Sequence, residues 1–436
     1  MINNAAGDSA DVVVIGGGVM GCSVAMHLAA LAGSGTRIVV VERDPSYRDC
    51  ATARSAGGVR QQFSTPECIA MSQATVAYVR GLAGQNPPPP RGEGSGVGGL
   101  PTQVVREDPH PRPLPARGKG DVAQPIGPFA FREQGYLLLA SAAGAATLTE
   151  NAELQRRHGA DTVLIAPADL TARFPWIDAV GVAAGSFGAS GEGWLDPALL
   201  LQHLRSEARA LGVTFRAGAV TGIEREGRRI AAVRLADGTR IATAHLVDCA
   251  GAAAGAVARL AGVELPVEPR KRFIFVFDCR DGPPGLAAAP LVVDPSGVWF
   301  RPEGYQFICG VSPASDADEP DPEDLGDVDY DLFQDKIWPV LAARVPAFEA
   351  VKLTGAWAGH YDFNTLDQNA VIGPHDEVAN LHFCAGFSGH GLQHAIAAGR
   401  AVAEQIVSGR LDTLDLARLG YDRIRRRQPL IERNVI

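Results

Sequence analysis

The feature that most constrains this chain is an apolar run that leads directly into a glycine-rich turn near its start. Residues 11–15 read Asp-Val-Val-Val-Ile, and Gly16, Gly18 and Gly21 then follow in the pattern G-x-G-x-x-G. An apolar run without polar alternation predicts a strand that is buried on both faces of a parallel sheet. The first glycine permits a tight turn, the second a close approach of the backbone to a pyrophosphate, and the third close packing of the next helix.

The residues after this turn support the same interpretation. We expect an alanine-rich helix at 19–32 and a second strand at 37–41, and Glu42 then lies where a ribose hydroxyl would be bound. Free N–H groups and the dipole at the start of such a helix attract phosphate groups. The sequence therefore predicts a dinucleotide site. A glycine-rich strand–turn–helix without a ligand is the alternative, because the chain contains 50 glycines.

Composition excludes several classes of protein. The chain has 436 residues, enough for two or three domains, and no apolar run approaches the roughly 18 residues of a transmembrane helix. The net charge is −9, and the acidic run at 316–331 reads as a solvated loop, so no basic face for nucleic acid is expected. Seven scattered cysteines without C-x-x-C favour reduced thiols over a zinc site or disulfides. Only ten residues precede the first strand, too few for a targeting peptide, so a cytoplasmic location is expected.

Residues 86–127 differ in kind from the rest of the chain. They contain four consecutive prolines, closely spaced glycines and a proline-rich run at 109–115. Such a segment cannot bury enough surface to offset the entropy of ordering, so it is predicted to be a disordered, polyproline-like insertion. A docking role for 109–115 is the functional alternative.

A second strand–glycine–helix unit occurs near the other end of the chain. Residues 381–384 read as a strand, 385–391 as a glycine-rich turn, and the residues from 392 onward as a helix with one apolar face. The start of this helix can direct free N–H groups at another electron-rich part of one long ligand. This pattern favours a two-ended cofactor over a nicotinamide cofactor. Between the two units, the pattern at 265–354 changes to antiparallel strands and a helix at 329–343, which indicates a second domain.

These features resemble the FAD-dependent D-amino-acid oxidase-like (DAO) superfamily, which includes sarcosine, dimethylglycine and glycine oxidoreductases. The first glycine pattern with Glu42-Arg43, the segment A-G-A at 250–252 and the unit G-F-S-G-H-G at 386–391 carry this resemblance. It extends over nearly the whole chain apart from 86–127. Four longer stretches are similar to flavoproteins linked to the assembly of respiratory complex I, namely 54–63, 267–272, 362–369 and 432–436.

The resemblance implies an α/β fold with two interleaved domains. One is a Rossmann-like FAD-binding domain of the glutathione-reductase type, formed by residues 1–85, 194–264 and 355–436. The other is an antiparallel-sheet substrate domain, formed by 128–193 and 265–354.

The resemblance also implies FAD, without a covalent link, as the cofactor. Its adenosine and pyrophosphate would contact the first glycine turn and nearby strand ends, that is Gly16, Gly17, Gly18, Val19, Met20, Gly21, Glu42, Arg43, Val220, Ala250 and Gly251. Its isoalloxazine would contact two loops, that is Arg54, Ser55, Ala56, Gly57, Gly386, Ser388, Gly389, His390, Gly391 and Leu392. A helix start at the pyrimidine edge would stabilise the negative charge that reduction places there.

For the substrate, the resemblance implies an amino-acid-like carboxylate bound by Arg60, because a guanidinium fork suits a carboxylate. A structural ion pair is the alternative role of this arginine. The candidate catalytic and pocket residues are Arg60, Tyr361, Asp362, His390 and Gln393.

The chain departs from the sarcosine-type pattern at three positions. Gln393 replaces a lysine of the carboxylate site, His360 replaces a cysteine that tethers flavin, and Ile308 replaces a lysine that activates oxygen. A dehydrogenase is therefore expected rather than an oxidase, with another protein or a quinone as the electron acceptor.

Several functions remain open. The first is oxidation of a C–N bond in a small amino acid or N-alkyl amino acid by hydride transfer to flavin. A variant oxidises a 2-hydroxy acid and needs a base such as His390 or His394. A different class is an FAD-containing assembly factor for respiratory complex I, with contacts through Arg270–Arg272, the acidic loop or Arg423–Arg427. A nicotinamide dehydrogenase leaves the unit at 386–392 unexplained.

Overall fold

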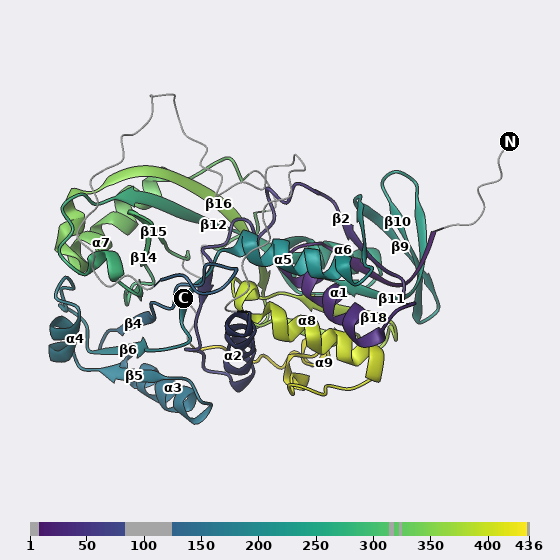
Figure 1. Cartoon of the computed structure of the whole chain (residues 1–436), viewed down its shortest axis with the longest axis horizontal. Helices are drawn as coiled ribbons and strands as arrows, with labels where there is room; N and C mark the ends of the chain where they lie inside the picture. Colours follow the sequence, from purple (N-terminus) through teal and green to yellow (C-terminus); the bar gives the residue numbers. More distant parts are fainter. Residues whose placement is uncertain (1–7, 83–123, 314–317, 322–324, 434–436) are drawn as a thin grey trace.

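The computed structural model describes residues 8–82, 124–313, 318–321 and 325–433. The elements form two units that lie side by side, each built on an eight-stranded sheet (Figure 1). The predicted disordered insertion lies outside the described residues except at 124–127. There Ile126 pairs with Phe131, so ordered structure resumes a few residues earlier than the sequence predicts.

The first unit contains the predicted parallel sheet, with strand order β17–β18–β11–β1–β2–β8. Its strands are β1 (Asp8–Ile15), β2 (Ile38–Glu42), β8 (Thr214–Ala217), β9 (Val220–Glu226), β10 (Arg229–Leu235), β11 (Arg240–Asp248), β17 (Val371–Pro374) and β18 (Leu381–Ala385). The central strand β1 pairs in parallel with both β11 and β2. Strands β9 and β10 extend from β11 as an antiparallel meander.

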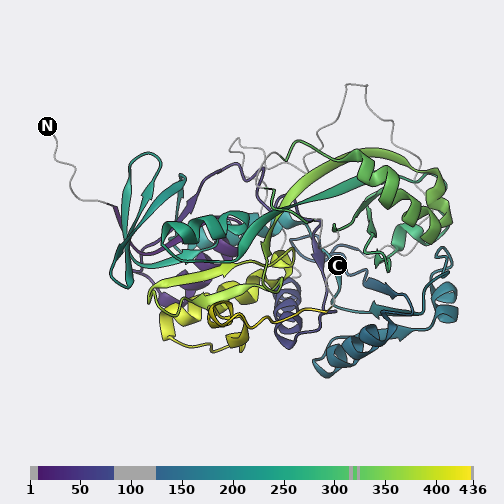
Figure 2. The same cartoon turned by 180° about the vertical axis from the view of Figure 1, so that it is seen from behind.

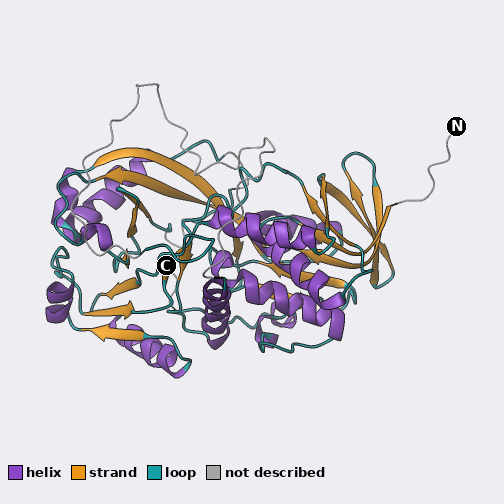
Figure 3. Ribbon diagram, viewed as in Figure 1, coloured by secondary structure: helices purple, strands orange, loops and turns teal. Residues whose placement is uncertain are grey.

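Helices cover both faces of this sheet because the side chains of β1 alternate between two apolar layers. Val12 and Val14 pack in the layer that contains α1 (Val19–Ala32), α5 (Pro197–Ala210) and α8 (Gly391–Ser408). Val13 and Ile15 pack in the opposite layer with α6 (Ala254–Leu260). Figure 3 shows α1, α5 and α8 side by side as one helical layer. Two further helices, α2 (Pro66–Gly81) and α9 (Asp422–Arg426), complete the unit.

Close packing of α1 against α8 brings the two glycine units together. Gly399 of α8 lies so near α1 that a Cβ atom there would be 2.3 Å from the Ser23 hydroxyl oxygen. That hydroxyl in turn donates a hydrogen bond to the Ala395 carbonyl oxygen at 2.7 Å. The two helices therefore run in contact, although α1 and α8 come from opposite ends of the described chain.

The second unit is built on a sheet with the order β16–β12–β15–β14–β13–β4–β6–β5. These strands are β4 (Tyr136–Ala140), β5 (Thr162–Ile165), β6 (Ala184–Gly188), β12 (Val267–Asp278), β13 (Leu291–Val293), β14 (Trp299–Glu303), β15 (Gln306–Gly310) and β16 (Lys352–Asn364). Helices α3 (Ala145–Arg157), α4 (Pro167–Arg173) and α7 (Trp338–Arg344) accompany it. Its core includes the fully buried rings of Phe275, Phe277, Phe300 and Phe348.

Two connections join the units. The long strands β12 and β16 reach from the second unit towards the first, which Figure 2 shows from behind. A two-stranded sheet of β3 (Gly58–Val59) and β7 (Gly193–Trp194) lies between them.

The predicted α/β fold with a parallel sheet and a separate, largely antiparallel sheet is confirmed, but several boundaries are wrong. The sequence pattern also predicts a meander of strands at 213–216, 219–226, 229–235 and 239–242, followed by a separate buried strand from 244. The structure joins the last two into one strand, β11 (Arg240–Asp248), because its backbone pairs continuously with β1. The segment predicted as the first strand of that meander, 213–216, corresponds to β8, which pairs in parallel with β2. Strand β16 pairs with β12, so residues 355–364 belong to the second sheet. The predicted helix at 329–343 is a π-helical stretch, Leu332–Ile337, followed by α7.

All seven cysteines are free thiols, as the sequence predicts. Within the ranges that the structure describes, no helix has both the length and the apolar character needed to cross a membrane.

Candidate functional site

One cavity of about 810 Å³ lies between the two units. Its lining includes Gly18 from the first glycine turn and Gly389 from the second. This volume falls within the range of ligand sites in proteins, roughly 300–1,000 Å³. The two glycine turns, which are predicted to contact opposite ends of one ligand, therefore share a single site.

The first glycine turn leaves no room for a side chain at Gly16 or at Gly21. Gly16 has a φ of +96°, and a Cβ atom there would lie 2.3 Å from the Cys249 carbonyl oxygen. A Cβ atom at Gly21 would lie 1.8 Å from the carbonyl oxygen of Gly16, so this glycine permits the close helix–strand packing that the motif predicts. The backbone of the turn can thus approach a ligand in the cavity directly.

Glu42 fixes this turn from the end of β2. One of its carboxylate oxygens accepts a hydrogen bond from the Gly17 N–H at 2.7 Å, and the other accepts one from the Asp44 N–H at 2.8 Å. The same side chain also lines the cavity. Each carboxylate oxygen has a second lone pair, which matches the predicted contact with ribose hydroxyls.

The second glycine turn is held by Asp362 of β16. Its carboxylate accepts hydrogen bonds from the Gly386 N–H at 2.8 Å and the Phe387 N–H at 3.0 Å. Burial raises the pKa of Asp362 to about 6, and the hydrogen bonds from the turn oppose that rise. At Gly389, φ is +94° and a Cβ atom would lie 2.4 Å from the Tyr361 ring, so only glycine lets the turn pass under this ring.

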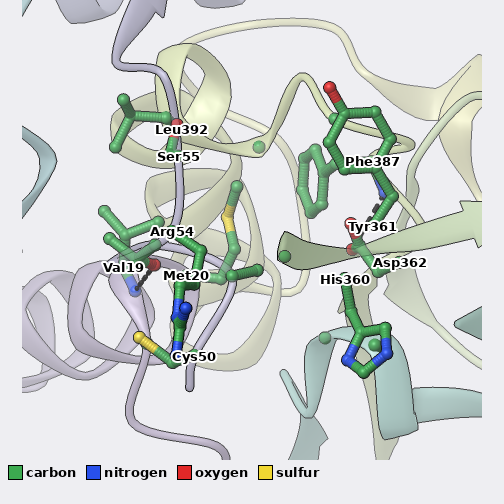
Figure 4. Close-up of a pocket in the computed structure, with 18 of the residues that line it drawn as sticks. Val19, Met20, Cys50, Arg54, Ser55, His360, Tyr361, Asp362, Phe387 and Leu392 are labelled. Carbon is green, nitrogen blue, oxygen red and sulfur yellow. Dashed lines mark hydrogen bonds between the residues drawn. The ribbon is translucent and has the colours of Figure 1, made fainter. Parts of the chain in front are cut away.

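Both helix starts face this cavity. A Cβ atom at Gly391, the first residue of α8, would lie 3.3 Å from the terminal carbon of Met20 in the first turn of α1. Figure 4 shows Val19, Met20 and Leu392 on one side of the cavity, with His360 and Tyr361 on the other. Two helix dipoles and two glycine backbones are thus directed into one elongated space. This arrangement fits the pyrophosphate and the isoalloxazine of FAD.

Most of the predicted cofactor and substrate residues line the cavity, including Val220, Ala250, Gly251, Arg54 and Gln393. Five do not, namely Gly17, Gly21, Gly57, Gly386 and Ser388. These five shape the backbone behind the lining. Gly57, for example, has a φ of +78° and approaches the Leu195 carbonyl oxygen, and the Ser388 hydroxyl accepts a hydrogen bond from the Asn364 N–H.

Arg60 lines the cavity but is also engaged by its neighbours. It is 3% exposed, its guanidinium lies 4.1 Å from the centre of the Phe63 ring, and it donates to the Gln62 carbonyl oxygen. Its backbone N–H donates to Oε1 of Gln393 at 2.7 Å. Burial lowers the pKa of Arg60, although an arginine remains a cation in a protein. Arg60 therefore places a fixed positive charge at this end of the cavity.

The contact between Arg60 and His390 sets the protonation of the histidine. A guanidinium N–H of Arg60 lies 3.1 Å from Nε2 of His390. Because guanidinium has only donors, Nε2 accepts and the ring proton is on Nδ1. Burial, reinforced by the charge of Arg60, places the pKa of His390 well below its ordinary value. The second predicted histidine, His394, has a pKa of about 3 because it is buried, and it does not line the cavity.

The second sheet contributes a wall of the cavity that the sequence pattern does not predict. Ile274, Leu291, Val293, Trp299 and Tyr136 all line the cavity. Their positions follow from strand pairing between segments that are far apart in the chain. The apolar character of single short strands gives no signal of which face meets a ligand.

The acidic loop is only partly as predicted. Among its described residues, Asp318 has a side chain that is only 9% exposed and binds the Arg272 guanidinium through both oxygens, at 2.8 and 2.7 Å. Arg272 lines the cavity and lies 5.2 Å from the centre of the Tyr361 ring. Lys271 pairs with Asp321 at 3.6 Å. The expectation of a wholly solvated loop is therefore wrong at Asp318, because this carboxylate neutralises buried cations.

The basic segments proposed as partner surfaces are only partly exposed: Arg270–Arg272 are largely internal, whereas Arg425 and Arg426 are exposed. The side chains of Arg270, Lys271 and Arg272 are 8%, 12% and 10% exposed. In the other segment Arg423 is buried against Asp367, and Arg425 and Arg426 both pair with Asp422.

Comparison with known proteins agrees with this geometry. The sequence model of the family described as "DAO: FAD dependent oxidoreductase" matches residues 11–102 and 118–405. A protein named FAD-dependent oxidoreductase domain-containing protein 1, from Bos taurus, is 41% identical over 95% of this chain and 85% of its own length. The mitochondrial sarcosine dehydrogenase of Mus musculus is 26% identical over 92% of this chain and 40% of its own length. The L-proline dehydrogenase of P. horikoshii has the same fold, with a TM-score of 0.74 at 23% identity over 96% of this chain and 99% of that chain. This chain therefore belongs to the DAO family of FAD-dependent oxidoreductases.

Proposed function

We propose that this protein oxidises the C–N bond of an amino acid or N-alkyl amino acid. Bound FAD supplies the hydride acceptor. The observation that carries the proposal is the composition of the cavity at the start of α8, where groups that bind a carboxylate lie beside a histidine, His390, whose acceptor nitrogen is already occupied.

The carboxylate-binding groups are Arg60, Gln393 and Tyr136. Arg60 gives a buried positive charge, and the side chain of Gln393 is fixed by its hydrogen bond to the Arg60 backbone. The hydroxyl of Tyr136 makes no hydrogen bond within the described part of the chain, although the residue is 6% exposed and lines the cavity. An unpaired buried hydroxyl near a cation suits an anionic ligand group.

The protonation of the nearby groups favours an amine over an alcohol. Oxidation of a 2-hydroxy acid needs a base for the hydroxyl proton, but Nε2 of His390 already accepts from Arg60. Burial raises the pKa of both Tyr136 and Tyr361, so these phenols stay protonated. A neutral amine needs no base for hydride loss, because its own lone pair drives the transfer.

The same cavity supports a dehydrogenase rather than an oxidase. Three of the four lysines, Lys271, Lys336 and Lys352, lie in described segments, and none of the three lines the cavity. The position expected to carry an oxygen-activating lysine holds Ile308, which is 1% exposed in an apolar cluster. We infer that another protein or a quinone accepts the electrons, and that FAD is dissociable because His360 stands at the tethering position.

The test is anaerobic mixing of the purified flavoprotein with a panel of amino acids, N-alkyl amino acids and 2-hydroxy acids. We expect loss of the oxidised flavin absorbance with one or more amines and none with hydroxy acids. Acid precipitation is expected to release the flavin. A panel of amines that leaves the flavin oxidised, while a hydroxy acid reduces it, would overturn the proposal.

The assembly-factor role rests on sequence resemblance, and the internal pairing of Arg270–Arg272 and of Arg423 removes part of its expected surface. The assembly-factor role would be supported if a variant whose flavin is no longer reduced by substrate still co-purified with respiratory-complex subunits.

A further inference from the structure

The second sheet presents a continuous apolar wall to the cavity. Neighbouring strands in the order β12–β15–β14–β13–β4 contribute Ile274, Gly310, Trp299, Val293 with Leu291, and Tyr136. All of these except Gly310 line the cavity. The wall is thus built by five adjacent strands, with the phenol of Tyr136 at one end.

Strand register places these side chains on one face. Leu291 lies opposite Tyr136 in the pairing of β13 with β4, and Val293 lies opposite Trp299 in the pairing of β13 with β14. Val292, between Leu291 and Val293, packs into the core on the other face. Because side chains alternate along a strand, Leu291 and Val293 share the cavity face.

A glycine sets the position of the indole ring in this wall. A Cβ atom at Gly310 would lie 3.0 Å from the Trp299 ring. The ring therefore lies directly against the backbone of β15 and closes the space between Val293 and Ile274. Trp299 is only partly buried although it is large and apolar, since part of it faces the cavity.

The Tyr136 hydroxyl lies at one end of this apolar surface. Tyr136 lies near the buried guanidinium groups of Arg60 and Arg301, whose positive charges act on its phenol. A Cβ atom at Gly58 would lie 1.9 Å from the Tyr136 hydroxyl oxygen, which places that oxygen against β3, directly before Arg60. The polar end and the apolar wall are therefore contiguous.

We propose that the wall of Ile274, Leu291, Val293 and Trp299 is a subsite for an apolar substituent of the substrate, with the Tyr136 hydroxyl as an anchor for its carboxylate. The substrate class is then an amino acid with a branched aliphatic or aromatic side chain, instead of glycine or another amino acid without an apolar side chain. This inference rests on the proposed function, because it assumes a carboxylate bound near Arg60. Burial of apolar surface would favour substrates with larger apolar side chains. Each buried carbon should increase the affinity roughly 4-fold.

The experiment uses acetate, 3-methylbutanoate and phenylacetate as probes, titrated into the oxidised FAD-loaded protein. Binding is measured from the change in flavin absorbance. We expect the dissociation constant to fall from acetate to the larger probes. Val293→Thr keeps the shape of the side chain but adds a hydroxyl. It should raise the dissociation constants of the two larger probes by roughly 4-fold and so reduce their advantage over acetate.

Two further variants separate the parts of the site. Val276→Thr on the same strand as Ile274 is the matched control, because Val276 does not line the cavity, and it should leave the gradient unchanged. Tyr136→Phe should weaken all three probes by roughly 10-fold and keep the gradient, since it removes only a hydrogen bond to a charged group. Flavin content and the thermal midpoint confirm that each variant is folded.

The outcomes distinguish this inference from the proposed function. A wild-type protein that binds no carboxylate contradicts the proposed function and the subsite with it. Equal affinities for the three probes, or a gradient that Val293→Thr leaves intact, overturn the subsite while the proposed function stands. An unchanged affinity in Tyr136→Phe overturns the anchor alone.

Discussion

At the scale of single residues, Glu192 is a buried carboxyl group behind the cavity. It is 1% exposed and accepts hydrogen bonds from the Gln61 N–H at 2.7 Å and the Gln62 side-chain amide at 2.8 Å. Burial raises its pKa from 4.5 to about 7, and these donors and the charge of Arg60 oppose the rise. The folded protein therefore binds a proton at Glu192 over a pH range in which the unfolded chain has released it.

This difference predicts a pH-dependent stability. A folded pKa above the unfolded value contributes stability that is fully present below about pH 4.5 and is lost as the pH rises to about 7. Relative to Glu192→Gln, the wild-type unfolding free energy should fall by up to about 1.4 kcal/mol per pH unit in that window. Urea unfolding at several pH values measures this slope. The exposed substitution Glu226→Gln is the control, and parallel curves for wild type and Glu192→Gln would show that Glu192 does not titrate there.

Ionisation of Glu192 also affects the cavity, because its negative charge acts on Arg60. An anionic Glu192 lowers the positive potential at the proposed carboxylate site, so acetate binding should weaken more steeply with rising pH in the wild type than in Glu192→Gln. Asp362, which lines the cavity and has a pKa of about 6, titrates in both proteins, so the difference between the two curves reports Glu192. His390 stays neutral and Tyr136 stays protonated in this window.

At the scale of elements, the contact between α1 and α8 decides whether both helix starts meet one ligand. Gly399→Ala would place a methyl group 2.3 Å from the Ser23 hydroxyl oxygen and force the helices apart. We expect a loss of about 1–3 kcal/mol in stability and a lower FAD content. Thermal unfolding and the ratio of flavin to protein absorbance measure the two effects.

Gly81→Ala is the matched control for this substitution. Gly81 ends α2, and a Cβ atom there meets nothing within 4 Å. Alanine is the better helix former by about 1 kcal/mol, so this variant should be neutral or slightly stabilised. Equal behaviour of the two variants would show that α1 and α8 tolerate a wider spacing.

The elements also show what a sequence can predict here. Both glycine turns can be found in the sequence because each depends on a strand, a turn and a helix that are consecutive in the chain. The roles of Gly16 and Gly21 follow from that local pattern, and the contacts of both residues confirm it. The π-helical stretch Leu332–Ile337 has no such local signal and is predicted as ordinary helix.

The part of the site that the sequence does not predict depends on pairing between segments that are distant in the chain. Tyr136 and Leu291 are neighbours only because β4 pairs with β13, and Asp318 is ion-paired because β12 places Arg270 and Arg272 beside it. A pattern of apolar and polar residues does not specify which strands pair. The sequence alone therefore does not show whether a carboxylate such as Asp318 neutralises a buried cation or is solvated.

At the scale of the whole molecule, one ligand is expected to bridge two glycine turns. FAD added to the apoprotein at about 100 times its dissociation constant should stabilise the fold by about 2.7 kcal/mol. AMP and riboflavin, which each reach one turn, should bind far more weakly than FAD because linking the two parts makes the second contact intramolecular. Thermal unfolding with each ligand tests this. Equal stabilisation by AMP and FAD would mean that the turn at Gly389 does not contact the cofactor.

The contact between α1 and α8 also sets the order of events during synthesis. A ribosome adds about 5–20 residues per second, so α1 leaves it roughly 20–75 s before α8 is made. Throughout that interval the nascent chain exposes the apolar face of α1 that α8 later covers, which is a target for chaperones. Strand β18 completes the central sheet beside β11 only at the end of the same interval. Flavin loading is consequently one of the last steps in the maturation of this protein, and a stalled translation product that stops before Gly391 cannot hold the cofactor.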